Sequence, residues 1–166
     1  MTTTIPWIFW LFPVVFTIHN IEEAVWLPEF SKRAGRFCRP VARLEFVFAV
    51  ACITALAAVI TALFYLKGPE SIPSYLFFAF NFVMLINVFV PHLAATIALR
   101  RYCPGLATGV LLLVPVTAGN LLVGYNRGYY HPALFGIIAI LFAGIVVGAI
   151  PVLFRIGRWV QRMGWR

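Results

Sequence analysis

The segment FTIHNIEEAVW, residues 16–26, carries one histidine and two glutamates inside a run that is otherwise apolar back to Ile5. His19 lies three residues before Glu22 and four before Glu23, so on a helix the three side chains share one face, one turn apart. An imidazole and a carboxylate at this spacing are what a helix offers to a divalent cation. We predict His19 and Glu23 as metal ligands, since they are about one 3.6-residue turn apart. Glu22 then remains as general base or bridging ligand.

The elements that position these residues are predicted to be membrane helices. The chain has 166 residues, of which 63% are hydrophobic and 11% charged, and its mean hydropathy is +0.96. A soluble domain of this size needs far more polar surface. A formal charge of +8 would suggest nucleic acid in a soluble protein. Here the basic residues cluster at the ends of apolar segments, which predicts membrane lipids as partners and no nucleic acid.

Five apolar stretches are each long enough to cross ~30 Å of hydrocarbon, which takes about 20 helical residues. We predict an all-α, polytopic membrane bundle that forms a single domain over residues 1–166. A basic cytoplasmic tail is expected over residues 155–166, either as an amphipathic segment on the inner leaflet or as an ordinary positive flank. The five transmembrane helices are predicted at approximately 5–27, 44–66, 75–99, 106–125 and 133–154.

The basic residues also predict the orientation of the bundle. Only Lys67 and Arg127 lie in the loops on one side. Because cytoplasmic loops carry the excess of Lys and Arg, the amino terminus should face outwards and the carboxyl terminus the cytoplasm. The first apolar run follows no basic segment and precedes no small-residue cleavage site, so we expect it to be retained. The eleven basic residues of the other side are Lys32, Arg33, Arg36, Arg39, Arg43, Arg100, Arg101, Arg155, Arg158, Arg162 and Arg166.

This orientation brings two more ionisable groups to the depth of His19. At ~1.5 Å per residue, His19 lies roughly 9 Å inside the cytoplasmic boundary and His92, in the third helix, about 10 to 12 Å inside it. Glu45 opens the second helix at the same edge. We therefore predict His92 as a further metal ligand, with Glu45 as an additional candidate. Pro91 cannot donate to the carbonyl of Asn87, so Asn87 is expected to lie behind the ligands and hydrogen-bond to them.

Simpler explanations stay open for these groups. The two adjacent glutamates would otherwise extend to the interface and pair with Arg33 or Arg36. Glu45 would pair with Arg39 or Arg43, and His92 would form a hydrogen bond between helices. In the outer half, Asn81 and Asn120 are expected to hydrogen-bond to each other, or else to mark the far end of a polar pathway that includes His131.

Two short motifs carry a resemblance to a known family. His19-Asn20-Ile21-Glu22-Glu23 fits an HXXEE signature and Tyr102-Cys103-Pro104-Gly105 a YXPG signature. Together they resemble the HXXEE family of small bacterial membrane proteins over roughly residues 16–105. The resemblance implies a multi-pass protein of the bacterial inner membrane and one further important histidine, which is His92 or, as the less favoured choice, His131. It implies a functional site without naming a reaction.

The YCPG segment also has a physical interpretation. Proline at the second and glycine at the third position of Cys103–Leu106 predict a type II turn. The Tyr102 hydroxyl, on the cytoplasmic side, is a candidate to orient a ligand or donate a proton. Cys38, Cys52 and Cys103 show no paired spacing, so neither a disulfide nor a sulfur metal site is expected.

Two classes of function follow. In the first, zinc, iron or manganese at the cluster activates water or oxygen against a lipidic substrate, as in a membrane hydrolase or oxidoreductase. In the second, the cluster binds no metal and relays protons for a transporter or holds a partner subunit. Abundant glycine and alanine also permit oligomers through close helix packing.

Overall fold

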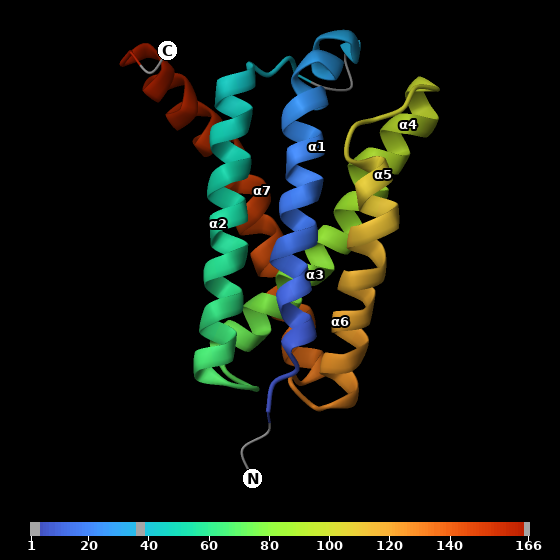
Figure 1. Ribbon diagram of the computed structural model, residues 1–166, viewed down its shortest axis with the longest axis vertical. Coiled ribbons are helices and arrows are strands. Elements are labelled where there is room, and N and C mark those ends of the chain that lie inside the picture. The colour runs from blue at the N-terminus through green and yellow to red at the C-terminus, as the bar shows by residue number, and fades with distance from the viewer. Residues whose placement is uncertain (1–3, 36–38, 165–166) are drawn as a thin grey trace.

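The computed structural model describes residues 4–35 and 39–164, and these ranges contain helices and no strand. Five helical segments are long and apolar enough to cross a membrane, which confirms the predicted all-helical architecture. The helices run lengthwise, and α1 begins at the end of the bundle opposite to the one where α7 ends (Figure 1). The expectations for Arg36, Cys38 and Arg166 lie outside the described residues.

Several of the five segments are composed of more than one helical element. The second is the single helix α2 (Arg43–Lys67) and the fifth the single helix α7 (Pro132–Arg162). The first joins η1 (Trp7–Trp10) to α1 (Leu11–Arg33). The third joins α3 (Ile72–Asn87), the π-helical η3 (Val88–Leu93) and α4 (Ala94–Leu99), and the fourth joins α5 (Leu106–Thr108), the π-helical η4 (Gly109–Leu113) and α6 (Val114–Asn126).

Helix α1 continues six residues beyond its predicted end at Leu27, through Pro28. Two local interactions stabilise this extension. The Ser31 hydroxyl donates to the Pro28 carbonyl at 2.7 Å, and Glu29 pairs with Lys32 at 2.9 Å and with Arg33 at 3.1 Å. Ion pairs at these spacings support a helix. Arg33 is thus paired with Glu29 rather than with the glutamates of the HXXEE motif.

Helix α7 is also longer than predicted. It runs without interruption to Arg162, so residues 155–162 of the predicted basic tail are its last turns. Gly157 lies directly against the start of α2, where a Cβ atom would come within 2.8 Å of the Glu45 Cα atom. A glycine at this crossing lets two backbones approach closely, as small residues do between membrane helices.

The core is formed around α3, which packs against α2, α6 and α7. In the half of the bundle near η1 it is filled by phenylalanine rings. The Phe9 ring lies 5.5 Å from that of Phe77 and 5.8 Å from that of Phe78, edge to face in both cases. Asn120 donates to Asn81 at 2.9 Å, which confirms the predicted hydrogen bond between helices. The fully buried rings are those of Phe9, Phe12, Phe64, Phe77, Phe78 and Phe80.

Candidate metal centre

Three side chains from two segments meet in the other half of the bundle. His19 and Glu23 come from α1 and His92 from η3, and one ligand atom of each lies within 4.8 Å of the other two. The Glu23 Oε1 atom is 3.0 Å from His92 Nε2 and 3.7 Å from His19 Nε2. His19 is 0% and His92 1% exposed. The described residues thus bring together three of the four predicted ligands.

The position of His92 depends on a break in the third segment. Val90 has φ −132° and ψ 105°, which is extended rather than helical. A residue before proline avoids the helical region because the proline ring crowds its backbone, and Pro91 follows here. The chain resumes as helix directly afterwards. The break therefore separates α3 from the turn that carries His92 towards α1.

The two ring nitrogens of His19 differ in their hydrogen bonding. Its Nδ1 atom lies 3.1 Å from the Thr108 hydroxyl. Its Nε2 atom is buried and has no hydrogen-bond partner among the described residues. A buried polar atom without a partner costs about 1–3 kcal/mol. A cation between His19, Glu23 and His92 would satisfy this atom, so the residues present fit a metal.

His92 is held at both ring nitrogens. Its Nδ1 atom lies 3.7 Å from the Cys103 sulfur, which is buried, and its Nε2 atom lies 3.1 Å from the Asn87 amide nitrogen. Asn87 is therefore in contact with His92, as predicted. It contacts the nitrogen that faces Glu23, however, rather than the one turned away from the cluster.

Glu22 binds the YCPG turn and the start of the fourth segment. One carboxylate oxygen accepts from the Gly105 amide at 2.9 Å and from the Tyr102 hydroxyl. The other accepts from the Thr108 amide at 3.1 Å and from the Thr108 hydroxyl at 2.6 Å. The acceptor capacity of Glu22, the predicted base, is thus directed at this turn and at α5. The two motifs form one unit through this carboxylate.

Tyr102 belongs to the same network. Its hydroxyl donates to Glu22 and accepts from the Ala107 amide at 3.0 Å. Burial, together with the hydrogen bond to Glu22, raises the pKa of Tyr102 above its usual value of 10. The phenol therefore stays protonated at neutral pH and remains a donor. Tyr102 therefore contacts Glu22 and the residues after the turn, rather than the ligands of the cluster.

Gly105 fits directly against both imidazoles. It has φ +93° and ψ −16°, and the Leu106 amide donates to the Cys103 carbonyl at 3.2 Å, which confirms the predicted type II turn. A Cβ atom at Gly105 would lie 2.7 Å from His92 Cε1 and 2.9 Å from His19 Cε1. The glycine of the YXPG motif is thus required by its backbone conformation and by the space that the histidines occupy.

Glu45 does not join the cluster, contrary to its selection as an additional ligand. One oxygen accepts from the Ala42 amide at 2.6 Å, which caps α2, and the other pairs with Arg158 of α7. An interhelical ion pair accounts for it, although the partner is Arg158 rather than a neighbour in sequence. His131, the less favoured second histidine, lies exposed before α7 and apart from the cluster.

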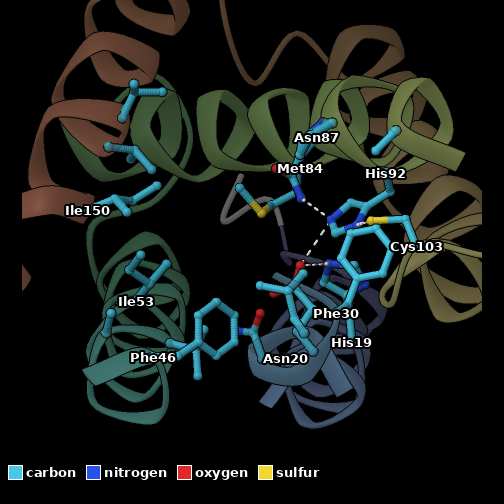
Figure 2. A pocket seen from close by; sticks show the side chains of 18 of the residues that line it. His19, Asn20, Phe30, Phe46, Ile53, Met84, Asn87, His92, Cys103 and Ile150 are labelled. Carbon is cyan, nitrogen blue, oxygen red and sulfur yellow. Dashed lines mark hydrogen bonds and ion pairs between the residues drawn. The ribbon is translucent and has the colours of Figure 1, made fainter. Parts of the chain in front are cut away.

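A cavity of about 290 Å³ extends from the cluster between α1, α2, α3 and α7. Figure 2 shows His19, His92 and Cys103 on one side of it and Ile53, Phe46 and Ile150 on the other. The volume is at the lower end of the range for ligand pockets, about 300–1,000 Å³. The polar atoms of this cavity are therefore gathered at one side, while most of its lining is apolar.

Sequence reasoning missed three polar residues of this region. Thr108 binds both His19 and Glu22, and Cys103 contacts His92. Asn20, inside the HXXEE motif, donates to Thr54 of α2 at 2.6 Å and lines the cavity. One signal was available: Thr108 lies one helical turn after Gly105 and near the start of the fourth segment. Nothing in the spacing of Cys103 or Thr54 indicated their partners.

Fold and site define a small helical protein, of membrane-spanning composition, whose polar centre joins two short motifs to a buried histidine of the third segment. The chain belongs to the family described as proteins of unknown function with an HXXEE motif, whose model matches residues 10–119. It is 44% identical over 150 residues to the uncharacterised protein YrkK of Bacillus subtilis strain 168, across 88% of this chain and 92% of that protein. No solved structure matches the chain.

Proposed function

We propose that this protein is a metal-dependent enzyme of the bacterial inner membrane that acts on a lipidic substrate. In this proposal the amino terminus faces outwards and the cluster opens to the cytoplasmic half of the bilayer. His19, Glu23 and His92 hold the cation, and the adjoining cavity receives an apolar part of the substrate. The reaction is a hydrolysis or an oxidation.

One observation carries the proposal. One buried imidazole nitrogen of His19 has no hydrogen-bond partner among the described residues, and it faces a carboxylate shared with a second buried histidine. Buried polar groups are normally hydrogen-bonded, and ionisable groups inside membrane segments mark functional sites. The apolar cavity beside the cluster gives a lipid-borne group a place next to the reacting centre.

The ligand set restricts the choice of metal. Two histidines and one glutamate form the open catalytic zinc site and also the facial triad of ferrous iron enzymes. Glu22 and Glu45 are engaged elsewhere, so the carboxylate-rich set that manganese prefers is absent from the described part of the chain. We therefore favour zinc or ferrous iron. Such a cation supplies Lewis acidity and lowers the pKa of a bound water.

This chain's own residues would orient the site. Thr108 binds the far nitrogen of His19, and Cys103 that of His92, so each ring is fixed in orientation from behind, as is usual for metal-ligating histidines. Tyr102 and Glu22 hold the turn that contains Cys103 and the following helix α5 that carries Thr108. The apolar lining limits the entry of water.

The alternative, a metal-free proton relay, has less support. Glu23 and His92 lie close enough to exchange a proton, at 3.0 Å. A relay across the membrane also needs polar groups through the other half of the bundle. That half is filled by buried phenylalanine rings, and Asn81 and Asn120 there bind each other.

Metal analysis of the purified protein and its variants tests the proposal. Purified without chelators, the wild-type protein should carry zinc or iron, up to one equivalent. His19→Ala, His92→Ala and Glu23→Gln should each remove it, because loss of a ligand from a three-ligand site leaves too few for tight binding. His131→Ala and Glu29→Gln alter exposed residues and should leave the metal content unchanged.

Two results would contradict the proposal. If the folded wild-type protein binds neither zinc nor iron when both are supplied, the relay becomes the better explanation. If His131→Ala lowers the metal content as much as His92→Ala does, the metal is bound elsewhere.

A further inference from the structure

A second cavity, of about 250 Å³, lies between the start of α2, the preceding segment and the end of α7. Three arginines and one glutamate line it, together with apolar residues of α7. Its charged residues are Arg39, Glu45, Arg155 and Arg158. It lies at the end of the bundle where α7 ends and α2 begins (Figure 1).

The charges of this cavity do not balance. Glu45 pairs with Arg158, and its other oxygen is taken by the Ala42 amide. Of the other two arginines, Arg155 makes no ion pair with any described residue, which leaves one positive charge of this cavity without a carboxylate partner there. Arginine binds phosphate through a planar fork of donors. Basic pockets between helices on the cytoplasmic side of a membrane bind the head groups of acidic lipids.

The apolar wall of this cavity leads towards the candidate metal centre. Ile150 and Phe154 of α7 line both this cavity and the larger one that contains His19 and His92. The Phe154 ring packs against that of Phe46, at 6.2 Å between centroids. An amphiphile with its head at the arginines therefore has an apolar route past these side chains towards the cluster.

A third cavity is an alternative entrance to the metal-centre cavity, and fewer charged side chains line it. It shares Phe30, Ala34 and Leu99 with the metal-centre cavity and is lined by Arg33, Arg101 and Glu29. Glu29 already neutralises Arg33 there, at 3.1 Å. The lining of the third cavity thus carries two arginines and one glutamate, against three arginines and one glutamate in the cavity between α2 and α7.

We infer that the cavity between α2 and α7 is a binding site for the phosphate head group of an acidic phospholipid, with one acyl chain directed past Ile150 into the apolar cavity. Arg155 binds the phosphate, while Arg158 holds Glu45 and keeps the two helices together. The inference rests on the proposed function in one respect: it names the substrate class of the metal centre as an anionic phospholipid.

Native mass spectrometry of the purified full chain tests this site. The probes are phosphatidylglycerol, the zwitterionic phosphatidylcholine and inorganic phosphate. Phosphatidylglycerol should bind more tightly than phosphatidylcholine. Arg155→Gln should weaken its binding about fivefold and the double variant Arg39→Gln/Arg155→Gln further, as expected for removing cationic side chains near an anionic lipid. Ile150→Trp, which fills the shared wall, should also weaken it.

Matched variants give the controls. Arg162→Gln lies on α7 outside this cavity and Arg101→Gln lines the third cavity, and both should bind phosphatidylglycerol like the wild type. Equal binding by all arginine variants, or a loss caused by Arg101→Gln alone, would overturn the inference. Arg155-dependent binding of inorganic phosphate that Ile150→Trp leaves unchanged would overturn it too, because the site would then serve a soluble anion.

The metal content separates this inference from the proposed function. Arg155→Gln should retain the metal, and His19→Ala should lose the metal but still bind phosphatidylglycerol. A wild-type protein without metal but with Arg155-dependent lipid binding would overturn the enzyme proposal and leave the lipid site standing.

Discussion

Glu22 and Glu23 are neighbours with identical side chains, yet they contact different parts of the molecule. A helix turns by about 100° per residue, which points Glu23 at the two histidines and Glu22 at the start of the fourth segment. Glu22 receives four hydrogen bonds from residues 102–108. The same carboxylate group is thus used once for a candidate cation and once to position a turn.

Conservative substitutions should distinguish the roles of these two glutamates. Glu22→Gln replaces an acceptor of four hydrogen bonds by an amide with one acceptor oxygen, so we expect a loss of about 1–3 kcal/mol in stability with the metal retained. Glu23→Gln should lose the metal. Thermal unfolding in detergent and metal analysis of the same samples measure both effects.

Glu29→Gln, at an exposed position of the same helix, is the control and should change neither quantity. Loss of metal from Glu22→Gln as complete as that from Glu23→Gln would show that both glutamates are ligands, as in a dinuclear site.

At the scale of elements, the turn before α5 sets how closely the fourth segment approaches the two histidines. Gly105→Ala should therefore weaken metal binding at least tenfold, because the added methyl group would lie within 3 Å of both imidazole rings and force one of them to move. Misplacing a ligand lowers metal affinity strongly. A titration with zinc, read as competition with a chromogenic chelator, measures the change.

Gly128→Ala is the matched control for this variant. Gly128 also has a positive φ, +66°, but a Cβ atom there would meet nothing within 4 Å. Both variants bear the backbone cost of alanine in the left-handed region, roughly 1–2 kcal/mol. Equal zinc affinity in the two variants would contradict the steric role of Gly105.

The elements differ in how far the sequence predicted them. The apolar lengths predicted all five helical segments, and the Pro-Gly pair predicted the turn at Gly105, because both signals are local. The ends of α1 and α7 were predicted too early, since hydropathy alone does not detect the Glu29 ion pairs that extend α1.

The same limit applies to the site. Helical spacing placed His19 with Glu23, and estimated depth brought His92 to them. The Glu45–Arg158 pair joins residues 113 positions apart, and the contacts of Thr108 and Cys103 depend on how α5 packs against α1 and η3. Such pairings depend on tertiary packing, which a single sequence does not reveal.

At the scale of the whole molecule, the proposed function requires the metal centre and the arginine-lined cavity to lie in the cytoplasmic half of the membrane. Reporter fusions after Arg36 and Arg166 should therefore report the cytoplasm, and a fusion after Glu70 should report the outside, because the basic residues lie overwhelmingly on the first side. Paired reporters that are active only inside or only outside measure this. An outside signal after Arg36 would place the arginine-lined cavity in the wrong leaflet.

The central claim is that His19, His92 and Glu23 share one cation, and X-ray absorption at the metal edge of the zinc-loaded protein tests it most directly. We predict a shell of nitrogen and oxygen at about 2.0–2.1 Å with the scattering of two imidazoles and no sulfur, and the scattering of one imidazole from any residual metal in His92→Ala. A sulfur at about 2.3 Å would place Cys103 on the metal, and a spectrum unchanged by His92→Ala would remove His92 from it. Either result would contradict the account.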